Sequence, residues 1–169
     1  SCAVIAGKGG NMQRDDWYTT SRDSAGLADP RVIGDYAARR ALSRLGAKII
    51  KTRSVPVLFE APLATGLIGS FTHAISGGAL YRRASFLLDH AGKAVLPAWM
   101  SLREEPHLRR GHGAGAFDSE GVATVASDLV RDGVLQRYVL GSYSARKLGL
   151  ESTGNAGGVH NLEVAANAG

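Results

Sequence analysis

Five histidines are the side chains of this sequence best suited to bind a metal ion, and they stand at positions 73, 90, 107, 112 and 160. No pair of them has the His-Glu-x-x-His spacing that places two imidazoles on one face of a helix. His107 and His112 flank Arg109 and Arg110, whose positive charges oppose a bound cation. We therefore interpret these two as exposed loop histidines and predict no zinc site from ligands that are neighbours in sequence.

Two carboxylates, Asp118 and Glu120, stand close enough to act as a general acid and base or to bind a hard cation. Gly121 follows them, which is typical of a turn in which a carboxylate accepts hydrogen bonds from backbone N–H groups. The turn explains these residue types equally well, and we favour it.

Tyr143 and Lys147 have the four-residue spacing that short-chain dehydrogenases use for proton transfer. Such enzymes need a glycine-rich turn between an upstream strand and helix, whereas here the glycine-rich residues 153–158 follow the tyrosine. Neither this run nor residues 7–10 end in the Gly-Lys-Ser/Thr of a phosphate-binding loop. We interpret both runs as turns in which close packing excludes side chains.

The composition is that of a globular protein. The chain has 169 residues, of which 44% are apolar, and this is enough for one domain or for parts of two. Its 22 glycines predict a mixed fold with many loops. The single cysteine, Cys2, cannot form an internal disulfide, so a reducing, cytoplasmic location is expected. The apolar residues 2–6 lack a preceding basic region and predict a buried strand rather than a signal peptide.

Charge and hydropathy argue against nucleic-acid and membrane functions. The net charge is +5, but the basic residues form dispersed pairs rather than a stripe, and no known nucleic-acid-binding motif is present. Residues 61–81 carry no charge apart from His73 when it is protonated, and they are long enough to span a membrane. Their many glycines and hydroxyl side chains are too polar for hydrocarbon, so we expect a buried helix and no membrane contact.

The first third of the chain predicts a hairpin and a helix. Residues 2–8 and 11–20 are apolar or aromatic runs on either side of a glycine pair, which is typical of two paired strands. Asp29 followed by a proline is a helix start, and apolar residues then recur at helical spacing until Gly46.

The middle of the chain predicts shorter elements. Residues 55–59 form an apolar run that indicates a strand, and residues 61–76 indicate a helix that ends at a glycine pair. Residues 94–102 are apolar but interrupted by proline, which favours strands near a sheet edge. Residues 104–115 are charged and rich in glycine, and we expect a long loop.

The last third predicts a second hairpin and a short helix. Residues 122–128 and 134–140 flank an Asp-Gly pair, a strong signal for a tight turn between strands. Residues 142–148 predict a helix closed by Gly149. The tail from Ser152 has no periodic pattern, so we expect a loop or a segment that lies against another part of the protein. The fold class predicted from these elements is α+β, with mainly antiparallel sheets and a few packed helices.

Seven short motifs occur in one collinear order over nearly the whole chain. They are Arg14-Asp-Asp-Trp-Tyr18, Pro56-Val-Leu-Phe-Glu60, Ala74-Ile-Ser-Gly-Gly-Ala-Leu-Tyr-Arg82, Ser85-Phe-Leu-Leu-Asp89, Phe117-Asp-Ser-Glu-Gly-Val-Ala-Thr124, Tyr143-Ser-Ala-Arg-Lys-Leu-Gly149 and Ser152-Thr-Gly-Asn-Ala-Gly-Gly158. Together they resemble the PmbA, or TldE, subunits of the TldD/PmbA metalloprotease family, also called the modulator of DNA gyrase family. Seven motifs in order are far more specific than any one of them.

The resemblance implies parts of two domains of the TldD/PmbA fold and a role in proteolysis. Members of the family form a cytoplasmic heterodimer with a TldD-like subunit that binds zinc. The heterodimer degrades unfolded or flexible peptides, including antitoxins, and processes the leader of a modified peptide antibiotic. The expected partners of this chain are therefore a TldD-like subunit and peptide substrates, with zinc bound in the partner and no cofactor in this chain.

The same resemblance implies that the metal motif has been lost. In the zinc subunit a helix carries His-Glu-x-x-x-His, and Ile68, Gly69 and His73 stand at the corresponding positions here. Ile68 cannot bind zinc, and Gly69 cannot accept a proton from water. We therefore assign no catalytic and no metal-binding residue, and we expect His73, Gly154 and Asn155 to lie in the peptide-binding cleft.

Family members are longer, so the resemblance implies an internal fragment. Residues 1–53 are expected to complete an N-terminal domain with the hairpin and first helix, and residues 54–169 to begin the C-terminal metalloprotease-like domain. Two alternatives remain open. One is an independent metallohydrolase that uses ligands such as His73, His160, Asp118 and Glu120. The other is a binding protein associated with DNA gyrase.

Overall fold

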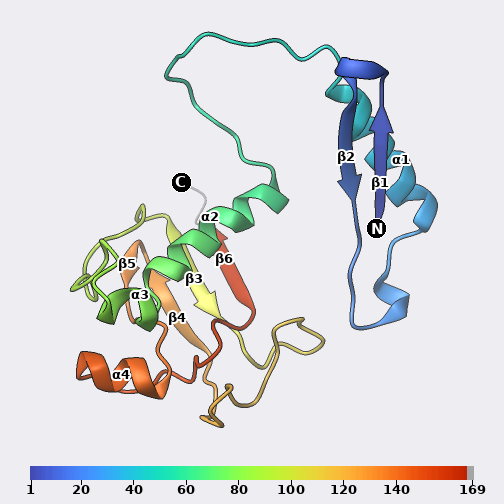
Figure 1. Ribbon diagram of the computed structural model, residues 1–169. Coiled ribbons are helices and arrows are strands. Elements are labelled where there is room, and N and C mark those ends of the chain that lie inside the picture. The colour runs from blue at the N-terminus through green and yellow to red at the C-terminus, as the bar shows by residue number, and fades with distance from the viewer. Residues whose placement is uncertain (167–169) are drawn as a thin grey trace. The chain divides into compact units, whose positions relative to one another are not determined.

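The computed structural model describes residues 1–166 and divides the chain into two compact units, Ser1–Val57 and Leu58–Gly169 (Figure 1). The assignment of the two units to an N-terminal and a C-terminal domain of a longer protein stays a prediction.

The first unit begins with the predicted hairpin. β1 (Cys2–Ala6) pairs antiparallel with β2 (Gln13–Trp17), so that Cys2 lies opposite Trp17. A short 3-10 turn, η1 (Gly9–Asn11), joins the strands. The strands are shorter than predicted, but the hairpin is confirmed.

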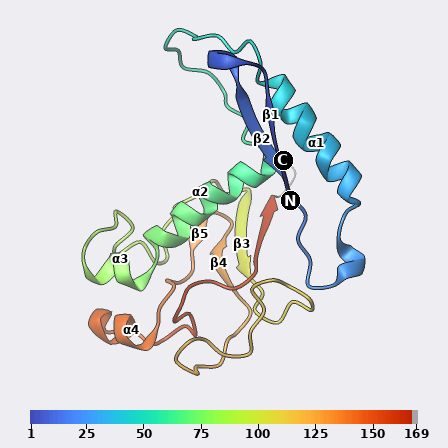
Figure 2. The ribbon, with the colours of Figure 1, turned by 45° about the vertical axis from the view of Figure 1, so that its right-hand side comes forward.

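The predicted helix of the first unit is also confirmed, as α1 (Pro30–Ser43), which follows the short 3-10 turn η2 (Ser24–Gly26). The side chain of Asp29 accepts a hydrogen bond from the Arg31 N–H at 2.7 Å, which satisfies one free donor at the helix start. Ile33, Ala37 and Ala41 recur every four residues and are buried, because this face of α1 packs against the hairpin (Figure 2).

The second unit is built on a four-stranded antiparallel sheet with the order β5-β4-β3-β6. The strands are β3 (Met100–Glu104), β4 (Ser127–Arg131), β5 (Val134–Leu135) and β6 (Leu162–Ala166). β4 and β5 form the predicted hairpin, because Asp132 and Gly133 both adopt the positive φ angles, 48° and 77°, that a tight hairpin turn needs. The predicted strand bounds, 122–128 and 134–140, were wrong, because only residues 127–131 and 134–135 form strands.

Three helices accompany this sheet: α2 (Ala61–Ala74), α3 (Gly77–Tyr81) and α4 (Ser142–Leu148). α4 ends at Gly149, whose φ of 68° is the left-handed conformation expected of a glycine cap. The α+β fold class is thereby confirmed. No helix within residues 1–166 is both long enough and apolar enough to cross a membrane.

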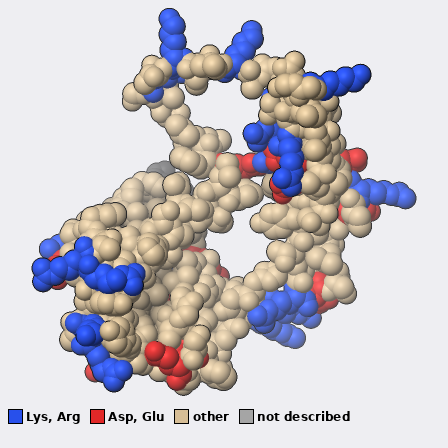
Figure 3. All heavy atoms as spheres, in the orientation of Figure 1, with Lys and Arg blue, Asp and Glu red and all other residues tan. Residues whose placement is uncertain are grey.

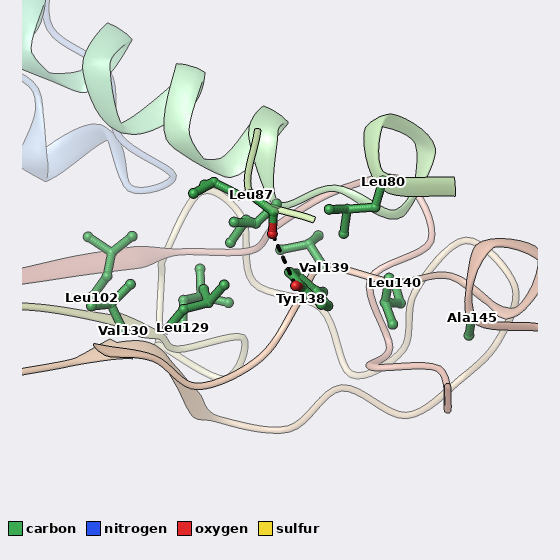
Figure 4. Close-up of a cluster of buried hydrophobic side chains, with 11 residues drawn as sticks. Leu80, Leu87, Leu102, Leu129, Val130, Tyr138, Val139, Leu140 and Ala145 are labelled. Carbon is green, nitrogen blue, oxygen red and sulfur yellow. Dashed lines mark hydrogen bonds between the residues drawn. The ribbon is translucent and has the colours of Figure 1, made fainter. Parts of the chain in front are cut away.

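The core of the second unit lies between the sheet and the segments that contain α3 and α4 (Figure 4). Its buried side chains are Ile75, Leu80, Leu87, Leu102, Leu129, Val130, Leu135, Tyr138, Val139, Leu140 and Ala145. The hydroxyl of Tyr138 donates to the Leu87 carbonyl at 3.1 Å and accepts from the His90 N–H at 2.9 Å. The one polar atom of this buried ring is therefore satisfied.

Three expectations about elements were wrong, and a fourth was met in part. Residues 55–59 are exposed and form no strand, because no strand of residues 1–166 lies beside them to provide hydrogen bonds. α2 contains no fully buried residue, although its apolar composition indicated a buried helix. β3 lies between β4 and β6 instead of at a sheet edge. The tail lies against another part of the protein, which is one of the two alternatives predicted for it, but it does so as a strand, β6, which pairs with β3 and which its small side chains did not indicate.

A fifth difference concerns the glycine pair predicted to end the second helix. α2 ends at Ala74, and Gly77 and Gly78 begin α3. A Cβ atom on Gly77 would lie 2.2 Å from the Ser144 Oγ and 2.4 Å from its Cβ. Gly77 is therefore needed for the close approach of α3 to α4, rather than for a helix end.

Candidate functional site

The glycine-rich residues 153–158, which we call the glycine loop, are hydrogen-bonded at their start to residues 137–140, which we call the core segment. The Thr153 Oγ1 accepts a hydrogen bond from the Leu140 N–H at 2.8 Å and donates to the Asn155 Oδ1 at 2.8 Å. Gly154 is buried with a φ of 69°, and a Cβ there would lie 2.7 Å from the Ala123 carbonyl oxygen. The loop is thus a tightly packed turn, as its sequence predicted.

Glu104, the last residue of β3, provides the buried anchor for this loop. The residue is only 1% exposed. Its Oε1 accepts from the Asn155 Nδ2 at 2.9 Å and from the His160 N–H at 2.6 Å, and the His160 Nδ1 lies 3.0 Å away. Its Oε2 accepts from the Arg137 Nη2 at 2.5 Å. One carboxylate therefore binds both Asn155 within the loop and His160 just after it.

Arg137 completes a network with Glu104, Asn155 and His160, which we call the Glu104 network. Its Nη1 donates to the Asn155 Oδ1 at 2.9 Å and to the Tyr138 carbonyl at 3.0 Å, and its Nε donates to the Ser127 Oγ at 2.9 Å. Every buried side-chain nitrogen and oxygen within residues 1–166 has a hydrogen-bond partner. Such complete pairing is what makes a buried charge tolerable.

Asp118 holds the glycine loop from the other side. Its Oδ1 accepts from the N–H groups of Glu120 and Val122 at 2.8 and 3.0 Å, and its Oδ2 accepts from the Ala156 N–H at 2.9 Å. Desolvation acts to raise the pKa of Asp118, but the hydrogen bonds from Ala156, Val122 and Glu120 outweigh it and lower this pKa below its ordinary value. The prediction of a turn closed by a carboxylate is confirmed.

Glu120 fixes the start of α4 in a similar way. Its Oε2 accepts from the Ser142 N–H at 2.7 Å. Hydrogen bonds from the side chain and backbone of Ser142 lower the pKa of Glu120. This carboxylate therefore remains ionised at neutral pH while it joins the turn to the helix.

A hollow of about 340 Å³ opens between α3, α4 and the glycine loop, and we call it the α3–α4 hollow. Its lining includes residues 76–78, Tyr81, Tyr143, Ser144 and residues 155–158. Much of this wall is backbone because five of the lining residues are glycines. Several of these backbone groups already have partners within the chain, such as the Gly77 N–H with the Val139 carbonyl and the Ala156 N–H with the Asp118 Oδ2, so the wall suits an extended peptide through its shape.

The positions that correspond to the zinc motif lie on α2. Ile68 faces an apolar groove of about 460 Å³, the α2 groove, which is also lined by Leu67, Phe71, Leu96, Met100 and Val164. Gly69 is exposed and nothing lies within 4 Å of the place a Cβ would occupy. His73 is exposed in the last turn of α2. These residues do not fit a zinc ion, because only one of the three has a donor atom.

The predicted site residues are only partly brought together. Asn155 lines the α3–α4 hollow, Gly154 lies buried beside it, and His73 stands apart on α2. Asp118 and His160 line one shallow hollow with His112, but the Asp118 oxygens already accept from backbone N–H groups and the His160 Nδ1 already pairs with Glu104. Within residues 1–166 no three His, Cys, Asp or Glu side chains form a group that could hold a metal ion.

The sequence reasoning missed Glu104 and Arg137. Glu104 was expected at the start of a loop, whereas it is the buried end of β3. The four residues of the Glu104 network are separated by up to 56 positions in the chain, so no local spacing connects them. A charged residue directly after an apolar strand was the only available signal, and it is weak.

The class of protein that carries this fold follows from the family comparison. A sequence model of the PmbA/TldA metallopeptidase C-terminal domain matches residues 52–168. The chain belongs to this family.

Individual relatives agree with the family assignment. The chain is 48% identical over 165 residues to Metalloprotease PmbA of Escherichia coli O157:H7, a match that covers 98% of this chain and 37% of that protein. A crystal structure from Bacteroides thetaiotaomicron, named as a modulator of DNA gyrase, superposes with a TM-score of 0.89 at 29% identity. It matches 96% of this chain and 37% of its own.

A TldD homolog of Haemophilus influenzae is 27% identical over 152 residues, which are 88% of this chain and 30% of that protein. The family therefore includes proteins of both the PmbA and the TldD name. The chain spans about 37% of the length of the PmbA relatives that it matches.

Proposed function

We propose that this chain is part of the non-zinc subunit of a cytoplasmic TldD/TldE-type metalloprotease, and that it completes the peptide-binding chamber of a zinc centre carried by a TldD-like subunit. The observation that carries the proposal is the environment of Ile68. Its side chain faces the apolar α2 groove with Leu96 and Met100, where a zinc ligand and its water would be poorly solvated.

Zinc hydrolysis needs about three protein ligands and a base that accepts a proton from water. Ile68 and Gly69 supply neither, and His73 alone would bind zinc weakly. Activation of water is therefore assigned to the partner. The residues of this chain would contribute by binding and orienting the substrate.

The α3–α4 hollow supports the substrate role. Its wall is held in place by the Glu104 network, and nothing lies within 4 Å of the place that a Cβ would occupy at Gly158, so an extended peptide can approach the backbone closely there. Most backbone of a folded protein is already packed or hydrogen-bonded, so it offers little extended chain to such a wall. Flexible peptides, including leader peptides and antitoxin segments, are the substrates that we propose.

Peptide cleavage by the full-length protein, measured alone and with its TldD-like partner, tests this proposal. We expect no zinc-dependent cleavage by the full-length protein alone and cleavage by the pair. The control is a partner whose motif glutamate is replaced by glutamine, which retains the zinc ligands but loses the base. Robust zinc-dependent cleavage by the protein alone would overturn the assignment.

A further inference from the structure

Two tyrosines form an aromatic pair at the rim of the α3–α4 hollow. The rings of Tyr81 and Tyr143 lie 5.7 Å apart at an angle of 83°, an edge-to-face contact. Tyr143 is 53% exposed although its ring is large and apolar. An exposed aromatic ring beside a hollow is typical of a binding surface.

Cations lie over both rings. The Arg82 Cζ is 5.4 Å from the centre of the Tyr81 ring, and the Lys147 Nζ is 5.7 Å from the centre of the Tyr143 ring. The neighbouring Arg83 and Arg146 are exposed as well. We call these six residues the basic rim, and Figure 3 shows lysine and arginine side chains gathered over α3 and α4.

The basic rim carries more positive than negative charge in the part of the chain that the structure describes, although Arg146 lies near enough to Glu120 to help lower the pKa of that carboxyl. None of its four cations forms an ion pair with Asp or Glu within residues 1–166. Glu120 is the one carboxylate among the residues that line the hollow, and its Oε2 already accepts from the Ser142 N–H. Four cations and one engaged carboxylate leave a positive field at the rim.

We infer that the basic rim binds an acidic segment of a peptide, with Asp or Glu side chains placed against Arg82 and Lys147 while the peptide backbone lies along the glycine wall of the hollow. This inference rests on the proposed function in peptide handling and names the class of peptide that is preferred. The two rings hold the cations in place, so less side-chain freedom is lost when a carboxylate binds.

The geometry favours an acidic peptide over a nucleic acid. Single-stranded nucleic acids bind through open aromatic faces on which successive bases stack. Here Arg82 lies over Tyr81, Lys147 lies over Tyr143, and the two rings contact each other edge to face. Carboxylates that pair with the cations need no such stacking platform.

Fluorescence anisotropy with labelled ten-residue peptides tests the inference on the full-length protein. One peptide contains four Glu residues, and its control has Gln at the same positions. All measurements are made without the TldD-like subunit and with a chelator present, so that binding is read in the absence of cleavage. If this protein cleaved peptides with its own zinc, the cleavage assay would show it. The binding measurement would still test the preference for acidic peptides.

We expect the acidic peptide to bind more tightly than its Gln control and to lose this advantage at high salt. The double variant Arg82→Gln/Lys147→Gln should weaken acidic-peptide binding about fivefold to tenfold and leave binding of the Gln peptide unchanged. The matched control is Lys93→Gln/Arg109→Gln, which removes the same charge from exposed positions outside the rim. Its affinity for the acidic peptide should stay within about twofold of the unsubstituted protein.

Equal binding of the two peptides would overturn the inference, as would an equal loss of affinity in the control variant. Tighter binding of a single-stranded oligonucleotide of the same charge, lost in the rim variant, would assign the surface to nucleic acid instead. All these variants replace exposed side chains, and an unchanged circular dichroism spectrum establishes that they are folded.

Discussion

Two regions of the second unit contrast sharply in how they are held: the glycine loop and helix α2. The loop is anchored by Glu104, a buried carboxylate with four hydrogen-bond donors of which Asn155 lies in the loop, and by one bond from the Ala156 N–H to Asp118. α2 has no fully buried residue and packs through Ile68, Phe71 and Ala74 at the margin of the core. The difference teaches that this chain fixes the wall of the α3–α4 hollow firmly, whereas α2 is attached only at the margin of the core.

Loss of the Glu104 carboxylate should have the largest effect on stability, and it tests whether this carboxylate anchors the glycine loop. Glu104→Ala leaves Arg137 charged and buried without its partner, and the expected loss of unfolding free energy is about 3–5 kcal/mol. Urea unfolding measures it. Glu163→Ala on the exposed side of β6 is the control and should cost less than about 0.5 kcal/mol. Equal effects of the two changes would contradict the anchoring role.

A pair of leucine truncations compares the core with α2 directly. Leu102 is fully buried in β3, and Leu102→Ala should lower the unfolding free energy by about 2–5 kcal/mol. Leu67 in the α2 groove is 52% exposed, so Leu67→Ala should cost about 1 kcal/mol or less. A large loss from Leu67→Ala would show that α2 is attached more firmly than we infer.

The close approach of α3 and α4 gives a smaller effect. Gly77→Ala places a methyl group against Ser144 and should destabilise the protein by about 1–3 kcal/mol. At Gly78 the nearest atom to an added methyl is the flexible end of Arg82 at 3.5 Å, so Gly78→Ala should be neutral or slightly stabilising. Thermal unfolding of the two variants checks this. If both tolerate alanine, Gly77 is not required for the contact.

The smallest expected effect is the acid dependence of the loop. The pKa of Asp118 is lower in the folded chain, so the unfolded chain binds more protons as the pH falls through about 4. The stabilisation from Asp118 is thus complete above pH of about 4 and is lost as the pH falls towards the folded pKa. Stability measured from pH 5 to 3 should therefore fall less steeply in Asp118→Asn. Asp132→Asn, at the exposed hairpin turn, should keep the original slope.

Elements with local signals could be predicted from the sequence. α1 follows from the Asp29 cap and the four-residue apolar spacing, the β4–β5 hairpin from Asp132 and Gly133, and α4 from Gly149. Each of these signals acts within a few residues, so it does not depend on the rest of the fold.

The remaining features depend on contacts between distant residues. β6 is a strand only because β3 lies beside it, and residues 55–59 are not a strand because nothing pairs with them in the described chain. The Glu104 network joins residues from β3, the core segment and the glycine loop, and no spacing in the sequence brings them together. The sequence therefore predicts Asn155 as a cleft residue but does not indicate its hydrogen-bond partners.

Zinc content is the measurement that tests the central claim most directly. The full-length protein, purified alone and as a complex with its TldD-like subunit, can be analysed for bound metal after dialysis. We predict no stoichiometric zinc in the protein alone and about one zinc per heterodimer, bound by the partner's motif. One zinc per chain in the protein alone, lost in His73→Ala, would contradict the claim.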